Sequence, residues 1–251
     1  MYRELIFRPL YNGLVGIMDL IPGIDVGIAV IIFTCIIRLV LFPLSKSALL
    51  TQVRMKGVEP EVNKIKAQYA TDRQTQALKI MELYKSKGIK PFSSILLIII
   101  QLPILFALIS VFYKIIPTIQ PDLLYSFINV PAVSPTLFGL DLTEKSLILA
   151  LITAVFQYFQ LHFSVAARQQ QAMSAQMVKN GGKLDMSAQL ANSMNSQMKY
   201  MLPIIAFVSL YWIIPASFPQ AAAIIAIYWS VSSLFTLAQE IYIKKRHIDG
   251  R

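Results

Sequence analysis

The stretch Ile28-Ala-Val-Ile-Ile-Phe-Thr-Cys-Ile-Ile-Arg-Leu-Val-Leu-Phe-Pro-Leu44 is apolar enough to cross a lipid bilayer, yet it contains Arg38. At the helical rise, Arg38 lies about 18 Å from Val26 in a hydrocarbon core about 30 Å thick. An arginine at the centre of a span costs on the order of 2.5–3.5 kcal/mol to insert. Either its head snorkels to the nearer interface, or it faces a wet or anionic surface inside the membrane. Thr34 shares its helix face, which favours a polar surface.

The composition of the whole chain agrees with a membrane protein. Of its 251 residues, 56% are hydrophobic and 14% are charged, and the mean hydropathy is +0.59. A soluble domain has about 25% charged residues. The single cysteine, Cys35, excludes a disulfide within the chain and a cluster of thiolate metal ligands. We therefore predict an all-α, polytopic membrane protein.

Apolar runs and charged segments divide the chain into spans and connections. The predicted spans are residues 26–44, 91–113, 146–167, 200–214 and 220–241. The connections are an N-terminal segment (1–25), a helical hairpin (45–90), a proline-rich loop (114–145), a methionine-rich loop (168–199) and a basic tail (242–251). In the N-terminal segment, helical spacing over Pro9–Leu20 predicts an amphipathic helix that either lies on the membrane surface or packs against the bundle. We expect Pro103 to kink the second span, and Pro215 and Pro219 to lie in a turn between the last two spans.

The hairpin segment carries ten Lys/Arg against four Asp/Glu. Apolar residues keep helical spacing on both of its arms, predicted at about Lys46–Tyr69 and Asp72–Lys87. Thr71 or Asp72 can cap the second arm, and Gly88 can end it. The apolar stripes would pair with each other, and the basic faces would attract anionic lipid headgroups.

The distribution of cations predicts the orientation of the chain. Segments 45–90, 168–199 and 242–251 together hold 18 Lys/Arg, whereas segments 1–25 and 114–145 hold four. By the positive-inside rule, the first set is cytoplasmic. The N-terminus then lies outside the plasma membrane and the C-terminus lies in the cytoplasm. Orientation thus accounts for most of the net charge of +10 without a nucleic-acid partner.

The sequence contains no set of residues typical of an enzyme or an energy-driven pump. It lacks a glycine-rich phosphate loop, a His/Cys cluster with metal spacing, and paired carboxylates within a span. The two histidines, His162 and His247, are far apart in sequence, and the acid nearest a span is Glu240 at its cytoplasmic end. We therefore expect no catalytic residues, no cofactor and no metal.

Motifs spread over nearly the whole chain resemble the YidC/Oxa-type family of membrane protein insertases. They are Arg8-Pro-Leu-Tyr-Asn-Gly13, Thr34-x-x-x-Arg38, Val58-Glu-Pro-Glu-Val-Asn-Lys-Ile-Lys66, Met81-Glu-Leu-Tyr-Lys85 with Gly88-Ile-Lys-Pro91, Gln101-Leu-Pro103, Gln197-Met-Lys-Tyr-Met201 with Pro203, Tyr228-Trp229 and Gln239. Each motif is weak alone, but their order and spacing on a five-span frame make a strong combined match.

The resemblance implies five helices around a hydrophilic groove that opens to the cytoplasm and the lipid. Arg38 would attract acidic residues in the translocated end of a substrate, and the candidate groove wall also includes Thr34, Gln101, Gln157, Tyr228 and Trp229. The apolar helix of the substrate would slide along the second and fourth spans, where Leu102, Leu105 and Leu210 are the candidate contacts. The implied partners are nascent membrane proteins and membrane lipids. The ribosome with its RNA, the signal recognition particle receptor and the Sec translocon are candidate contacts for the hairpin and tail.

Two other classes of protein remain open. A small secondary transporter or channel would use Arg38 as an anion site, and it would show inverted repeats, which the two halves of the sequence lack. An assembly factor that binds lipid and partner helices without inserting them would tolerate the loss of Arg38.

Overall fold

The computed structural model describes residues 2–90, 93–115, 118–163, 200–217 and 221–247. Within these ranges it leaves out the side chains of residues 52, 56, 93–98, 101, 102, 217, 244 and 247. The predicted methionine-rich loop (168–199) and the last residues of the predicted third span lie outside the described residues.

The described chain is mostly helical. Before the long connecting loop, its elements are η1 (Arg3–Phe7, a π-helical turn), α1 (Arg8–Leu20), α2 (Val26–Val40), α3 (Phe42–Gly57), α4 (Glu59–Gln68), α5 (Arg73–Ser86) and α6 (Ser93–Ile115). From the loop onward they are η2 (Pro121–Leu123, a 3-10 turn), β1 (Thr136–Leu137), β2 (Leu140–Asp141), α7 (Leu147–Phe163), η3 (Ser209–Ile213, a π-helical turn), α10 (Ile214–Ser217) and α11 (Ala222–His247). Residues 200–208, ahead of η3, are also helical.

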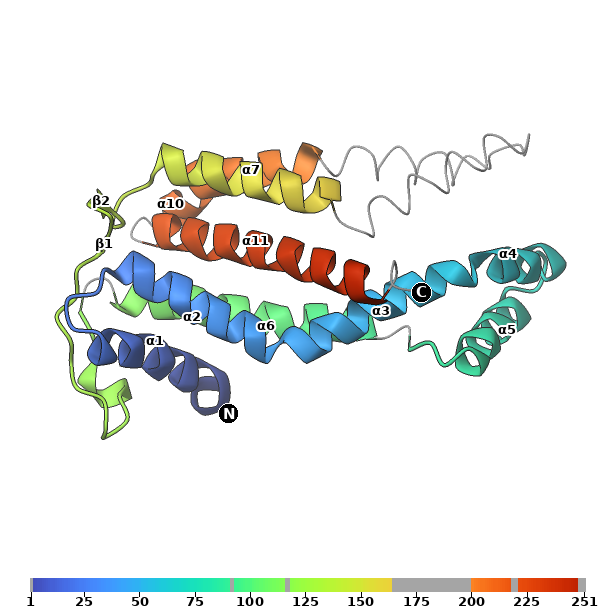
Figure 1. Cartoon of the computed structure of the whole chain (residues 1–251), viewed down its shortest axis with the longest axis horizontal. Coiled ribbons are helices and arrows are strands. Elements are labelled where there is room, and N and C mark those ends of the chain that lie inside the picture. The colour runs from blue at the N-terminus through green and yellow to red at the C-terminus, as the bar shows by residue number, and fades with distance from the viewer. Residues whose placement is uncertain (1, 91–92, 116–117, 164–199, 218–220, 248–251) are drawn as a thin grey trace.

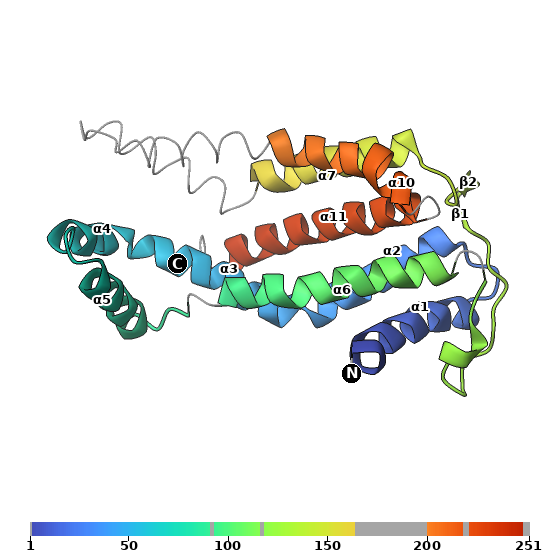
Figure 2. The ribbon, with the colours of Figure 1, turned by 180° about the vertical axis from the view of Figure 1, so that it is seen from behind.

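Helix α11 lies in the middle of the helical body. It packs against α7 on one side and against α2 on the other, with further contacts to α6 and α3. Figures 1 and 2 show it between the α7–α10 layer and the α2–α6 layer. The main apolar core accordingly draws buried side chains from α1, α2, α6, α7 and α11. A polar side chain on α11 is therefore surrounded by other helices.

Length and hydropathy identify one clear membrane-spanning segment among the described residues, Ala222–Ile243 of α11, with a mean hydropathy of 1.5. The pair Val26–Val40 and Phe42–Met55 meets the same test as one bent unit. Shorter apolar helices cover Pro103–Ile115, Leu147–Phe163 and Tyr200–Ala216. These helices agree with an all-α membrane protein.

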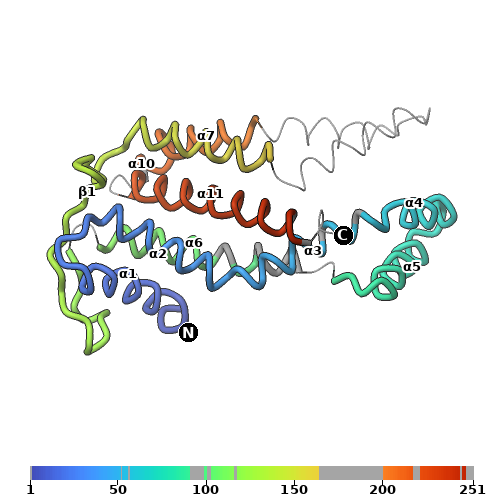
Figure 3. The backbone as a smooth tube through the Cα atoms, in the orientation of Figure 1, coloured from blue at the N-terminus to red at the C-terminus, as the bar shows by residue number. Residues whose placement is uncertain are grey.

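The first predicted span differs from the structure at its end. It was expected to reach Leu44, but α2 ends at Val40 and the chain bends by 56° into α3. Pro43 is the physical reason, because its ring has no N–H donor and crowds the carbonyl four residues earlier. Helix α3, which contains the start of the predicted first arm, therefore begins at Phe42, inside the predicted span. Figure 3 shows the chain running on without reversal from α2 through α3.

Other prolines also bear on where the helices begin and end. Pro60 lies in the first turn of α4, where its missing N–H is tolerated, and the predicted arm 46–69 is divided at Val58 into α3 and α4. Pro215 lies in α10 instead of the predicted turn. Pro103, where a kink is predicted, lies inside α6, which continues to Ile115. The basic tail predicted from residue 242 begins as the last turns of α11.

The hairpin of α4 and α5 projects from one end of the body, opposite β1 and β2 (Figure 1). It has a small core of its own, in which Val58, Val62 and Ile89 are buried. An ion pair between Lys87 Nζ and Glu61 Oε1 (2.9 Å) joins its two arms. As predicted, Asp72 caps α5: its side chain accepts a hydrogen bond from the Thr75 N–H (3.0 Å).

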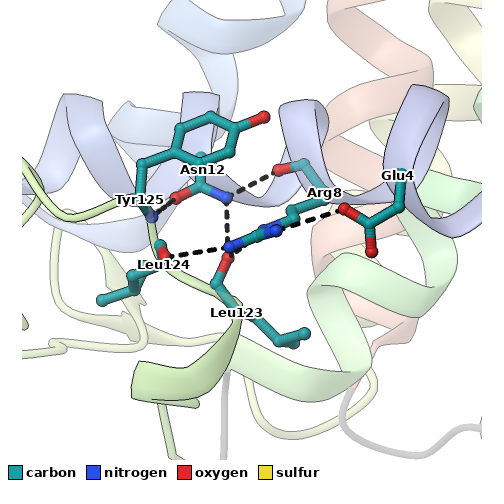
Figure 4. Close-up of polar contacts among 6 residues, drawn as sticks. All are labelled: Glu4, Arg8, Asn12, Leu123, Leu124 and Tyr125. Carbon is teal, nitrogen blue, oxygen red and sulfur yellow. Dashed lines mark hydrogen bonds and ion pairs between the residues drawn. The ribbon is translucent and has the colours of Figure 1, made fainter.

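Helix α1 packs on the body and fastens the loop that follows α6. Asn12 Nδ2 donates to the Leu123 carbonyl (2.9 Å), and Asn12 Oδ1 accepts from the Tyr125 N–H (2.6 Å). Arg8 Nε donates to the same Leu123 carbonyl (3.2 Å), and its guanidinium lies 5.3 Å from the centre of the Tyr125 ring (Figure 4). The phenol of Tyr11 accepts from the Gln120 N–H (2.7 Å).

The motif Arg8–Gly13 therefore has a structural role as a clasp for residues 120–125. Of the two readings left open for the N-terminal helix, packing against the bundle is the one seen: Tyr11, Leu14, Val15 and Met18 are fully buried in the main core. Gly13 belongs to the same arrangement, because a Cβ there would lie 2.7 Å from Cε2 of Phe33 on α2.

Candidate functional site

Helix α11 carries a series of buried polar side chains inside the apolar body. Tyr228, Ser230, Ser232, Ser233 and Gln239 are all buried. A hydroxyl or amide moved from water into an apolar environment costs several kcal/mol unless it finds a hydrogen-bond partner. The partners of these groups therefore show how the polar interior is built.

The first connection is between α7 and α11. Thr153 Oγ1 lies 2.8 Å from Ser230 Oγ, 3.0 Å from the Ala226 carbonyl oxygen and 2.8 Å from the Leu149 carbonyl oxygen. A threonine hydroxyl has a single proton to donate. Ser230 can therefore donate to Thr153, which in turn donates to a carbonyl of one helix or the other.

The second connection is between α2 and α11. The guanidinium of Arg38 on α2 interacts with the side chain of Tyr228 on α11. Thr34, one turn earlier on α2, is buried and donates to the Val30 carbonyl of its own helix (2.6 Å). The structure thus brings Arg38 and Tyr228 together from positions 190 residues apart in the sequence.

The third connection lies at the end of the body nearest the hairpin. Gln239 Nε2 donates to Ser45 Oγ and to the Phe42 carbonyl (3.4 Å). These contacts attach α11 to the first turn of α3, next to the bend at Leu41. Ser45 also donates to carbonyls of Leu41 and Phe42, so one hydroxyl supports the bend and the helix contact together.

Two buried oxygens have no hydrogen-bond partner among the described groups. They are Oε1 of Gln157 on α7 and Oγ of Ser232 on α11. Both side chains are buried, and both helices carry the Thr153–Ser230 connection. Helices α7 and α11 therefore each have a buried oxygen with spare capacity to accept a hydrogen bond.

The remaining predicted site residues are placed as follows. Trp229 is partly buried against the main core, as is Leu105 of α6. Leu210 of η3 is only 2% exposed, so it would reach a substrate only if neighbouring helices moved. Gln101 and Leu102 lie on α6, but their side chains are outside the described residues.

Sequence reasoning did not single out Thr153 or Ser45. Each is one hydroxyl within or beside an apolar run, and its importance comes from a partner more than 70 residues away. The sequence gives a clearer indication of buried polar groups on α11, because this apolar helix contains a hydroxyl-rich stretch with Ser230, Ser232 and Ser233.

Comparison with known proteins gives the chain its family. The family described as "60Kd inner membrane protein" matches residues 17–250, which is nearly the whole chain. The chain belongs to this family. The match confirms the resemblance that the sequence motifs suggested.

Individual relatives carry a common name. A protein of Clostridium tetani named "Membrane protein insertase YidC" is 27% identical over 226 residues, which are 89% of this chain and 84% of that protein. Proteins of the same name from Hahella chejuensis and Dinoroseobacter shibae are 29% and 27% identical and align with 98% and 92% of the chain. The chain spans only 36% and 35% of those two longer proteins. In line with the prediction that the chain is not an enzyme, all three relatives are named as insertases.

Proposed function

We propose that this chain is a membrane protein insertase whose working surface is centred on Arg38. The observation that carries the proposal is the interaction of Arg38 on α2 with Tyr228 on α11, in a largely apolar helical body that also buries several other polar side chains. Membership of a family whose members are named insertases supplies the reaction class. An intramembrane arginine costs free energy, so a chain that keeps one there has a use for a positive charge at that depth.

The proposed mechanism is electrostatic. Arg38 attracts an acidic residue in the short translocated end of a nascent membrane protein and lowers the cost of moving that end part-way across the bilayer. Thr34, Gln101, Gln157, Tyr228 and Trp229 form the polar wall that receives the chain. The unpaired oxygens of Gln157 and Ser232 support this role, because they can accept hydrogen bonds from the backbone of a substrate.

The apolar part of the substrate takes a separate route in this proposal. It slides into lipid along Leu102 and Leu105 of α6 and along Leu210 of η3. The burial of Leu210 implies that the helix made by residues 200–217 separates from its neighbours during passage.

The proposed topology has five spans, with the N-terminus outside and the C-terminus in the cytoplasm. It rests on the count of cations in each connection. It also fits the placement of the α4–α5 hairpin at the end of the body opposite β1 and β2 (Figure 1). The hairpin and the tail are then the surfaces available to a ribosome, a targeting receptor or a Sec-type translocon.

Complementation tests the proposal. A bacterium depleted of its own insertase expresses the wild-type chain or its Arg38→Lys or Arg38→Ala variant, and protease protection follows insertion of a small single-span substrate. A substrate with an acidic translocated tail is compared with one whose tail is neutral. Lys66→Ala, which removes an exposed hairpin cation, is the matched control.

We expect wild type and Lys66→Ala to insert both substrates. Arg38→Lys should retain part of the activity, and Arg38→Ala should fail on the acidic tail at equal abundance. If Arg38→Ala inserts both substrates as well as wild type does, the electrostatic mechanism is wrong. If well-expressed wild type inserts neither substrate, the insertase proposal itself fails, and solute flux through the chain becomes the next measurement.

A further inference from the structure

A basic cavity of about 300 Å³ lies where α3 meets the segment that follows the hairpin. Its lining includes the cationic side chains of Lys46, Arg54 and Lys90 and the hydroxyl side chains of Ser47 and Thr51. No acidic side chain is among the described residues that line it. A cavity of this size with three cations and two hydroxyls has the chemistry of an anion site.

The sequence of α3 places two of the cations on one face. Lys46, Leu50 and Arg54 follow one another at intervals of four residues, so their side chains lie one above the other. Ser47 and Thr51 repeat the same spacing one position later. Leu50 gives the wall between the two cations an apolar surface.

The third cation comes from the other arm of the hairpin through a turn at Gly88. Gly88 has a φ of +63°, which favours glycine, and its N–H donates to the Lys85 carbonyl (3.1 Å). The next N–H, from Ile89, donates to the Tyr84 carbonyl (2.9 Å), and the Ile89 side chain is buried in the hairpin core. This turn ends α5 and brings Lys90 back to α3.

Two cations of the cavity, Lys46 and Arg54, differ from two cations of the hairpin in their pairing. Lys79 pairs with Glu82 and Lys87 pairs with Glu61, each at 2.9 Å. In the described part of the chain, Lys46 and Arg54 form no ion pair. Cations held around one cavity repel one another, and a bound anion relieves that repulsion.

The surroundings of the cavity point to a lipid as the source of the anion. Leu39 and Val40, which precede the lining residue Pro43 by only a few positions, are 61% and 72% exposed. An exposed apolar surface beside a basic cavity fits a ligand that has both an acyl chain and an anionic head. A soluble phosphate would make no use of the apolar part.

We propose that this cavity binds the phosphate of an anionic phospholipid headgroup, with the acyl chain of the lipid against Leu39 and Val40. The bound lipid would hold the bend between α2 and α3 at the membrane surface. The inference rests on the proposed orientation of the chain and does not require that the chain insert substrates.

The test uses the full-length chain in detergent and measures its binding of phosphatidylglycerol, of phosphatidylcholine and of inorganic phosphate, by native mass spectrometry and by the shift in melting temperature. The test variant is Lys46→Gln/Arg54→Gln. Its matched control is Lys64→Gln/Lys66→Gln, which removes two exposed cations of α4 that do not line the cavity. Single Arg54→Gln is the second variant if the double variant does not fold.

We expect wild type and control to bind phosphatidylglycerol more tightly than phosphatidylcholine. The test variant should lose affinity for phosphatidylglycerol by about thirtyfold, because it removes two cations and each cation near an anionic lipid contributes about one kcal/mol. Equal losses in test and control variants would overturn a specific site, and stabilisation by inorganic phosphate equal to that by phosphatidylglycerol would overturn the lipid assignment. The complementation assay separates the two proposals, since wild type can bind the lipid and still fail to insert, or the reverse.

Discussion

Thr153 of α7 and Ser230 of α11 hold their hydroxyl oxygens 2.8 Å apart in the middle of the helical body. Thr153 is fully buried and also reaches the Ala226 carbonyl, so the same side chain joins α7 to both a side chain and the backbone of α11. Between two apolar helices, such a hydroxyl pair fixes their rotation and their relative height, because sliding either helix would leave buried polar groups unpaired.

This relationship predicts a measurable coupling. Thr153→Val keeps the shape of the side chain but removes the hydroxyl, and it should lower the free energy of unfolding in detergent by about 0.5–1.5 kcal/mol. Ser230→Ala should cost a similar amount, and the double variant less than the sum. Thr236→Val is the control, since its hydroxyl donates only within α11, to the Ser232 carbonyl (2.8 Å). Additive losses would mean that the two hydroxyls do not act together.

The interaction of Arg38 with Tyr228 makes a second prediction. Arg38→Leu should leave the fold intact or more stable, because it removes the insertion cost of an intramembrane charge. Tyr228→Phe should lower the melting temperature of the wild-type chain, because the guanidinium loses its interaction with the phenol oxygen, but should have little effect in the Arg38→Leu background. A large drop for Arg38→Leu alone would identify Arg38 as a structural group instead of a substrate-binding one.

The clasp between α1 and the loop makes a third prediction. Asn12 is 2% exposed and bonds the Leu123 carbonyl and the Tyr125 N–H. Asn12→Ala leaves the Tyr125 N–H without its acceptor and leaves the Leu123 carbonyl with only the longer bond from Arg8 (3.2 Å). We expect a loss of about 1–3 kcal/mol in unfolding free energy and faster proteolysis within residues 118–135. Asn129→Ala should cost less, since the bonds that it removes, from Asn129 Nδ2 to the Asp19 carboxylate (3.4 and 3.5 Å), are exposed. Equal effects would show that burial is not what makes the clasp strong.

Patterns local in sequence allowed good prediction of where helices lie. The start of α2 at Val26, the cap at Asp72 and the turn at Gly88 each depend on residues within a few positions. The effect of a proline on a helix end was less predictable, because neighbouring helices decide whether a proline bends or ends a helix. Pro43 ends α2 early, whereas Pro215 is accommodated in α10.

The sequence allowed prediction of which polar residues belong to the candidate site, but not of which side chains interact with each other. Arg38 and Tyr228 were both identified as polar residues of apolar helices, yet nothing local in the sequence says that their side chains interact. Thr153 was missed for the same reason. Its role depends on α11 lying against α7, which is a property of tertiary packing.

Two glycines give a fourth prediction, because they differ in the room available for an added Cβ atom. A Cβ at Gly27 would lie 2.6 Å from Cβ of Leu137 in β1, an atom that cannot move without its backbone. Gly27→Ala should therefore destabilise the chain by about 1–3 kcal/mol. Gly57→Ala is the matched control, because nothing lies within 4 Å of its Cβ and it ends α3. It should leave the melting temperature unchanged or raise it, and similar losses for the two variants would contradict a packing origin.

The last prediction concerns acid and the hairpin. Hydrogen bonds from Thr75 hold the pKa of the Asp72 carboxyl below its usual value. A carboxyl whose pKa is lower in the folded state stabilises that state fully when the pH is above its pKa in the unfolded chain, which is about 3.9 for aspartate. That contribution is lost as the pH falls through the lower, folded pKa.

Hydrogen exchange of the Thr75 amide in the full-length chain measures this loss. Protection in the first turn of α5 should decrease on acidification below about pH 4, ahead of α11, which contains no aspartate. Asp72→Asn keeps a capping oxygen but cannot titrate, so its protection should not change with pH over this range. If Asp72→Asn loses protection along the same pH curve as wild type, a different group controls the acid response of the hairpin.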